Sequence, residues 1–135
     1  MNTHELEGAA LDYWVAKALG LTCRLMKAGE RLANVALSED TCVTLTEGSK
    51  DWYQPYHPSS VWFFAGPIIQ QVRIATWADE ENWCALLPGT GSGYYDADLG
   101  TIDANHYDAM SGPTPLVAAM RALVQSEFGD FVTFQ

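Results

Sequence analysis

Hydrophobic residues recur at helical spacing near the start of the chain. From Leu6 to Trp14 the apolar positions fall on one stripe of a helix that we expect over residues 4–19. Thr3 has a side chain suited to cap this helix, and Gly20 follows it as the residue that ends it. Further apolar positions widen the stripe, so the helix is predicted to be buried on more than one side.

A second helical pattern lies near the C-terminus. Thr114 is a favourable N-cap, Pro115 suits the first turn because its missing N–H needs no partner there, and Gly129 supplies the stop. Apolar residues between Leu116 and Phe128 form the stripe that is predicted to face the core. The opposite side of the helix is expected to carry Ala118, Arg121, Ala122 and Gln125.

The middle of the chain alternates between apolar and polar positions, which is typical of strands. Strands are predicted over residues 22–26, 41–46, 68–77, 83–87 and 131–134. Residues 30–37 fit either a short helix or another strand, and Asp79, Glu80 and Glu81 form an acidic turn. With a helix at each end, this pattern predicts a single α+β domain over residues 1–135, in which the two helices pack on a mixed or antiparallel sheet.

Two stretches rich in glycine and proline interrupt the pattern. Residues 47–67 and residues 88–111 hold these residues at a density that predicts long ordered loops rather than regular elements. Long loops in a small domain often carry the functional residues, so both stretches are candidates for a site.

Acidic residues outnumber basic residues by 17 to 7, which gives the chain a formal net charge of −10. Affinity for nucleic acid comes largely from lysine and arginine side chains that neutralise phosphates, so nucleic-acid binding is not expected. Binding to an anionic membrane surface is disfavoured for the same reason. The excess of acids either keeps the protein soluble or forms a face that meets a basic partner.

The three cysteines, Cys23, Cys42 and Cys84, are far apart in the sequence and form no CxxC pair. We expect them to be reduced, buried and apolar in character rather than a disulfide frame or a zinc site. The first residues carry acids and lack the apolar segment of a signal peptide, and no run of about 18 apolar residues occurs. The expected compartment is therefore the cytoplasm, and no metal or cofactor is expected.

Four blocks of the sequence resemble a known family. The blocks are LEGAALDYWVAKA at residues 6–18, YHPSS at 56–60, GPII at 66–69 and GPTPLVAAMR at 112–121. Each block is weak alone, but in this order they resemble the NinX-like family of bacteriophage proteins over residues 5–130. Residues 63–65 and 89–95 depart from the family pattern.

This resemblance implies a phage or prophage accessory protein made in the cytoplasm of a host bacterium. It implies origin more than chemistry. Several phage proteins of this size act against host defence, some by sequestering nucleotide signals. Such a role is inferred for this chain only by analogy with other phage proteins, and not from particular residues.

Aromatic and hydroxyl side chains gather in the first predicted loop, at Tyr53, Tyr56, His57, Ser59, Ser60 and Trp62. Rings on a loop either form a platform on which a flat ligand stacks or cover the core beneath them. Arg73 and Arg121 are scarce cations whose guanidinium groups suit a phosphate or carboxylate, or an ordinary salt bridge with Asp12 or Glu127. Thr114 and the free N–H groups at the helix start would donate hydrogen bonds to the same anion.

Motifs for catalysis or metal binding are weak. Residues 89–93 lack the lysine of a phosphate-binding loop and are expected to form a flexible loop or a lid. Asp96 and Asp98 are followed by a glycine one place too early for a calcium loop. Neither His57 nor His106 has a nucleophile or metal ligand at a fixed spacing, so no enzyme activity is expected, and a hydrolase of nucleotide-like substrates is the minor alternative.

Two functions follow from these observations. In the first, the protein binds a small anionic ligand that carries a ring, such as a nucleotide-derived host signal. The residues expected to contact this ligand are Tyr53, Tyr56, His57, Ser59, Trp62, Arg73, Thr114 and Arg121. In the second, acidic residues 79–81 and 96–108 meet a basic host protein and inhibit it. Exposed aromatics and sheet edges also permit a homodimer.

Overall fold

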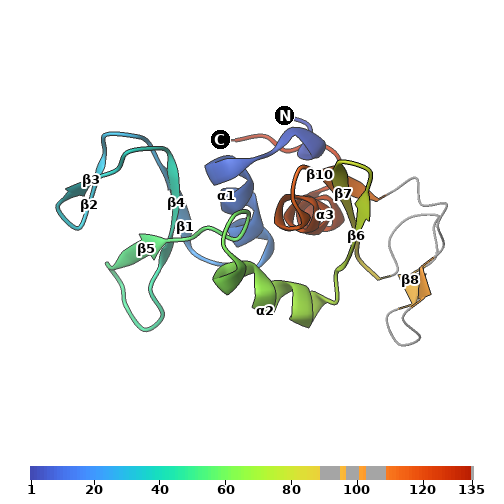
Figure 1. The fold of residues 1–135 in the computed structure, drawn as a ribbon. Coiled ribbons are helices and arrows are strands. Elements are labelled where there is room, and N and C mark those ends of the chain that lie inside the picture. The colour runs from blue at the N-terminus through green and yellow to red at the C-terminus, as the bar shows by residue number, and fades with distance from the viewer. Residues whose placement is uncertain (89–94, 97–100, 103–108, 135) are drawn as a thin grey trace.

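The computed structural model describes residues 1–88, 95–96, 101–102 and 109–134. Helices α1 (Gly8–Ala18), α2 (Trp62–Val72) and α3 (Pro115–Phe128) form the centre of the molecule, and small sheets lie on two sides of them (Figure 1). This arrangement confirms the predicted α+β class with helices near both ends of the chain. Among the described residues, no helix is long and apolar enough to cross a membrane.

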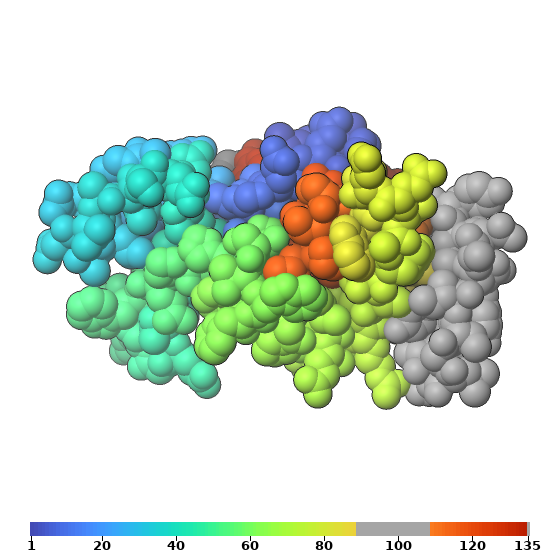
Figure 2. All heavy atoms as spheres, in the orientation of Figure 1, coloured from blue at the N-terminus to red at the C-terminus, as the bar shows by residue number. Residues whose placement is uncertain are grey.

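All strand pairs in the described residues are antiparallel. The strands are β1 (Cys23–Met26), β2 (Arg31–Leu32), β3 (Val35–Ala36), β4 (Thr41–Leu45), β5 (Tyr53–Pro55), β6 (Ala75–Asp79), β7 (Asn82–Leu86), β8 (Tyr95–Asp96), β9 (Thr101–Ile102) and β10 (Met110–Gly112). They form a sheet β1-β4-β5, a sheet β10-β7-β6, and the hairpins β2-β3 and β8-β9. In place of the one sheet expected, small separate sheets flank the helices, and the strands up to β5 form one end of the molecule (Figure 2).

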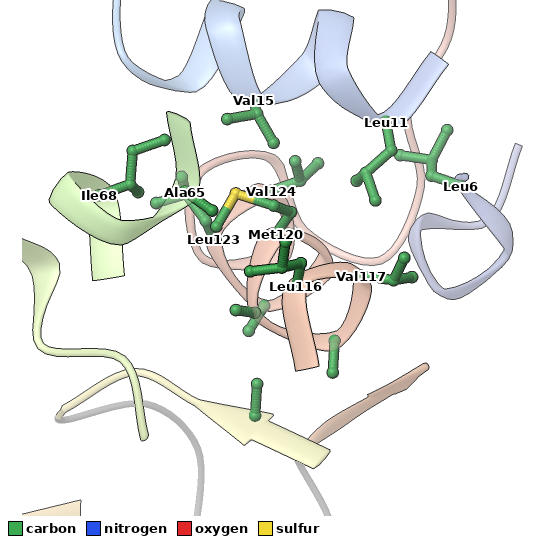
Figure 3. Packing of buried hydrophobic residues seen from close by; sticks show 14 of the residues in the cluster. Leu6, Leu11, Val15, Ala65, Ile68, Leu116, Val117, Met120, Leu123 and Val124 are labelled. Atoms are coloured by element: carbon green, nitrogen blue, oxygen red, sulfur yellow. The ribbon is translucent and has the colours of Figure 1, made fainter. Parts of the chain in front are cut away.

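The core surrounds α3. Every residue from Leu116 to Val124 is buried, because α1, α2 and the sheet β10-β7-β6 together cover the helix. Figure 3 shows Leu11 and Val15 of α1 and Ile68 of α2 directed toward this helix. The predicted solvent face of α3 is therefore wrong: Ala118, Arg121 and Ala122 are buried, and Gln125 is half-buried.

Both ends of α3 follow the sequence prediction. The hydroxyl oxygen of Thr114 accepts the N–H of Val117 at 3.1 Å, and Pro115 occupies the first turn. Gly129 ends the helix with φ of 84°, in a region of backbone conformation that favours glycine. These signals are local in the chain, which is why the sequence alone locates them.

The start of the chain differs from the single helix expected over residues 4–19. A short 3₁₀ turn, Thr3–Glu5, precedes α1, and Leu6 and Glu7 separate it from Gly8, the first residue of α1, whose φ is 57°. Thr3 does not cap α1; its buried hydroxyl donates to the carbonyl of Gly129 at 2.7 Å. The two ends of the chain lie side by side (Figure 1), and an isolated bridge between Asn2 and Phe131 stands where a C-terminal strand was predicted.

The predicted loop over residues 47–67 and the predicted strand over 68–77 are both partly wrong. The loop region contains β5 and most of α2, and α2 continues to Val72 before β6 begins at Ala75. Ile68 is buried, Ile69 and Val72 are half-buried, and the residues between them are exposed, which is the period of a helix and not of a strand. Glycine and proline near the middle of this helix are residues that usually interrupt helices, so the sequence pattern does not predict it.

Two further expectations are resolved. Residues 30–37 form the hairpin β2-β3, whose turn residues Ala33 and Asn34 have φ of 49° and 70°. The acidic turn at residues 79–81 joins β6 to β7 as predicted. The glycine-rich residues 89–94 lie outside the described residues, as do Asp98, Asp103, His106 and Asp108.

Candidate functional site

A surface cleft of about 790 Å³ opens where the N-terminal ends of α1, α2 and α3 meet. Its wall is formed by residues 7–9 and 12 of α1 and its cap, residues 39–40 before β4, residues 57, 59, 60 and 62 at the start of α2, and residues 114–117 of α3. Four carboxylates line it: Glu7, Asp12, Glu39 and Asp40. None of the described lysines and arginines lines it, so we name it the acidic cleft.

Asp12 links two of the segments that line the acidic cleft. Its side chain is 2% exposed, and Oδ1 accepts the backbone N–H of Ser59 at 2.7 Å. Burial raises the pKa of Asp12 to about 6, while hydrogen bonds from Ser59 and the nearby His57 lower it in part. Asp12 therefore ties α1 to the segment before α2, and its carboxyl group has a pKa well above that of an exposed aspartate.

The other three carboxylates are exposed. Asp40 accepts the backbone N–H of Ala28 at 2.9 Å and lies 3.5 Å from the ammonium of Lys27. The Ala28 hydrogen bond, aided by Lys27, holds the pKa of Asp40 below its usual range. Glu7 precedes α1 and Glu39 precedes Asp40, and neither forms an ion pair with another described residue.

The charge of the acidic cleft is negative even when the helices are counted. Each helix N-terminus contributes roughly half a positive charge, so the three ends supply about one and a half. The four carboxylates exceed this value, even if Lys27 neutralises Asp40. A cation is therefore favoured in the acidic cleft over an anion.

The structure brings together four of the residues predicted to form a site. His57, Ser59, Trp62 and Thr114 all line the acidic cleft, and the Trp62 ring is 58% exposed. A tryptophan in this position can stack on a cationic side chain as well as on a flat ring. Half of the predicted set thus converges, although the residues come from segments more than 50 positions apart in the chain.

The remaining predicted residues lie elsewhere. Tyr56 is buried against Phe64, with ring centroids 5.3 Å apart, and burial raises its pKa to about 12. Tyr53 lies on β5 under the guanidinium of Arg24. Arg73 ends α2 in a left-handed conformation with φ of 63°. None of these side chains lines the acidic cleft.

The Arg121 side chain forms hydrogen bonds inside the protein and does not line the acidic cleft. Its Nε donates to the carbonyl of Leu6 and its Nη1 to the carbonyl of Ser111, each at 2.8 Å. The salt bridge with Asp12 or Glu127, which the sequence left open as the alternative to anion binding, is not formed, because the guanidinium is buried among backbone oxygens instead. Burial lowers the pKa of Arg121 from its usual value, and the charge of Glu7 opposes this shift.

The sequence prediction missed the carboxylates that give the acidic cleft its character. From the sequence, Asp12 was expected at most as a salt-bridge partner of an arginine, and Glu7, Glu39 and Asp40 had no predicted role in a site, because only the fold shows that α1 and the segment before β4 adjoin. No three His, Cys, Asp or Glu side chains among the described residues are placed to hold a metal ion. The chemistry that this arrangement offers is the binding of an ammonium or guanidinium group.

Comparison with models of known protein families gives a match that spans most of the chain. No curated protein matches the chain. The family model described as "Bacteriophage P22, NinX" matches residues 2–127, which include α1, the acidic cleft and nearly all of α3. The chain therefore belongs to the bacteriophage P22 NinX family.

Proposed function

We propose that this phage protein is a non-enzymatic binding module whose acidic cleft holds a basic segment of a host protein. The observation that carries the proposal is a cleft lined by four carboxylates and by none of the described lysines and arginines. Membership of a phage family makes the bacterial host cytoplasm the natural source of the partner. Inhibition of that partner would follow if its basic segment is needed for its own activity.

The cleft suits a lysine or arginine side chain. Glu7 and Glu39 are exposed and form no ion pair with another described residue, so both carboxylates can accept hydrogen bonds from a guanidinium. The Trp62 ring offers a face for a cation–π contact of about 0.5–2 kcal/mol. The net charge of −10 also attracts a basic partner before contact is made.

An anionic ligand carrying a ring remains the other proposal drawn from the sequence. The acidic cleft supports it less well, because an anion there would meet the carboxylates of Glu7, Glu39 and Asp40. Of the two arginines predicted to meet its charge, Arg121 is buried against two carbonyls. Such a ligand requires a more positive surface than this cleft.

The first test measures binding of a short arginine-rich peptide by isothermal titration calorimetry at low salt. The double variant Glu7→Gln, Glu39→Gln removes two cleft charges without changing side-chain size. We expect it to weaken binding by about 2- to 30-fold, because each of the two exposed charge pairs contributes about 0.2–1 kcal/mol. The matched control is Glu80→Gln, Glu81→Gln, which removes two charges at the turn between β6 and β7.

The control decides between two acidic surfaces. If the turn variant weakens peptide binding and the cleft variant does not, the partner meets the turn that the sequence first indicated, and the cleft proposal is wrong. If wild-type protein does not bind the peptide at low salt, a basic partner is excluded at either surface. Trp62→Ala should weaken an arginine peptide more than a lysine peptide, because the planar guanidinium stacks better.

A further inference from the structure

We infer that a second site, formed by the β2-β3 hairpin and the turn before β5, binds a small anion that carries a flat ring, such as a nucleoside monophosphate. The site is a pocket of about 410 Å³ whose polar and aromatic lining is Arg24, Arg31, Asp51, Trp52 and Tyr53. We call it the arginine pocket. Figure 2 shows the hairpin and the turn as neighbouring projections at one end of the molecule.

The charge of the arginine pocket is opposite to that of the molecule. The chain has only 7 basic residues against 17 acids, yet Arg24 and Arg31 both line this one pocket. Neither arginine forms an ion pair with another described residue. Asp51 is the one carboxylate in the lining, so the pocket carries a net positive charge of one.

The two guanidinium groups are held by contacts that leave donors available. The Arg24 guanidinium lies over the Tyr53 ring, with Cζ 4.7 Å from the ring centroid. Stacking occupies the face of the group and leaves its in-plane N–H donors for a phosphate. Arg31 donates from Nη2 to the carbonyl of Asn34, which fixes its side chain along the hairpin. Guanidinium groups suit a phosphate monoester because each can donate two parallel hydrogen bonds to its oxygens.

Trp52 supplies the surface for the ring. Its side chain is 66% exposed, although its backbone is anchored on both sides. The backbone N–H donates to Oγ of Ser49 at 3.0 Å, and the carbonyl accepts the N–H of Thr46 at 2.7 Å. The ring therefore projects from a fixed turn, and stacking of a base on it would add about 1–3 kcal/mol.

The pocket suits a mononucleotide rather than a nucleic acid. Its volume of about 410 Å³ lies in the range of small-molecule sites. A polymer would bring further phosphates against a chain of net charge −10, and no extended row of cations is present in the pocket lining to neutralise them. The ligand class is the one the sequence predicts, but of the residues predicted to contact it only Tyr53 lies in this pocket.

The test uses calorimetry with adenosine monophosphate, adenosine, inorganic phosphate and a short single-stranded DNA as separate probes. We expect the monophosphate to bind more tightly than phosphate or adenosine alone, because only it contacts both Trp52 and the arginines. Arg31→Gln and Arg24→Gln should each weaken the monophosphate about tenfold. Trp52→Ala should reduce its affinity to that of phosphate. Asp51→Asn should tighten it about threefold by removing a like charge.

Lys17→Ala is the matched control. Lys17 lies 5.4 Å from the Tyr13 ring centroid on α1, so this variant removes one positive charge and one cation–π contact outside the pocket. If it weakens the monophosphate as much as Arg31→Gln does, the effect is one of overall charge and the pocket is wrong. Tighter binding of the oligonucleotide than of the monophosphate would replace a mononucleotide site by a nucleic-acid site.

The two sites can fail independently. The variant Glu7→Gln, Glu39→Gln should not weaken monophosphate binding, and Arg31→Gln should not reduce peptide binding. Loss of monophosphate binding in the cleft variant would show that the anion binds in the acidic cleft, against both proposals. No binding of any probe at millimolar concentration would overturn the arginine pocket alone.

Discussion

The carboxyl group of Asp12 makes stability depend on pH between about 4 and about 6. Its pKa in the folded protein is about 6, against 3.8 for an exposed aspartate. Between these values the folded state holds a proton that the unfolded state has lost, so the free energy of unfolding falls as pH rises from about 4 to about 6. The full effect is at most about 3 kcal/mol, because one pKa unit corresponds to about 1.4 kcal/mol.

Asp12→Asn should remove this pH dependence. The amide oxygen can still accept the N–H of Ser59, and the amide carries no charge to desolvate. We expect the variant to gain stability relative to wild type between pH 4 and pH 7, measured by urea unfolding at both pH values. Asp40→Asn, at an exposed carboxylate of the same cleft, is the control and should not give this gain. A constant difference between Asp12→Asn and wild type across that range would contradict the raised pKa.

Arg121 shows the limit of prediction at the scale of a residue. The sequence identifies it as a scarce cation in a specific motif, which favours a role in binding. The fold places the carbonyls of Leu6 and Ser111 at 2.8 Å from its nitrogens, and those partners lie 115 and 10 positions away in the chain. Partners at such a separation carry no local signal, so the sequence could not distinguish a clamp for a ligand from a link between α3, β10 and the start of the chain.

At the scale of elements, the start of α3 is fixed by close packing against β10. A Cβ atom on Gly112 would lie 2.9 Å from the backbone nitrogen of Ala118 and 2.9 Å from Cγ1 of Val117. The backbone of α3 cannot move away without disturbing the core that surrounds it. Gly112→Ala should therefore lower the free energy of unfolding by about 1–3 kcal/mol, measured by urea or thermal unfolding.

Gly66→Ala is the matched control for this prediction. Gly66 lies within α2, and a Cβ atom there would meet nothing within 4 Å. Because alanine favours a helix over glycine by about 1 kcal/mol, this variant should keep or raise the stability. If both variants change stability by the same amount, the loss at position 112 does not come from the close packing of Gly112 against α3.

The same contrast explains which elements the sequence could predict. The cap, proline and stop of α3 are adjacent in the chain, and α3 is found where they indicate. In α2, Gly66 and Pro67 lie inside the helix, and their presence gives the sequence the pattern of a loop. The acidic cleft depends on the packing of α1, α2 and α3. The sequence therefore shows the residues that line it but does not show that they lie close together.

At the scale of the whole molecule, two proposed binding sites of opposite charge share one strongly acidic chain. The acidic cleft adds to the field of a net charge of −10, whereas the arginine pocket opposes it. A basic peptide would therefore be attracted at long range by the net charge of the chain and at contact by the carboxylates of the cleft. A small anion is repelled at long range and attracted only at contact, where two arginines act over a few ångströms.

This difference predicts opposite responses to salt. Raising the ionic strength from about 0.01 M to about 0.15 M shortens the Debye length from about 30 Å to about 8 Å, which screens the distant charges more than the contacts inside a pocket. Peptide affinity should fall steadily over this range, while monophosphate affinity should hold or rise, both measured by calorimetry. The triple variant Glu80→Gln, Glu81→Gln, Glu127→Gln removes three charges outside both sites and should make the monophosphate response flatter. A monophosphate affinity that falls as steeply as that of the peptide would mean that local contacts, rather than the field of the whole chain, govern both sites.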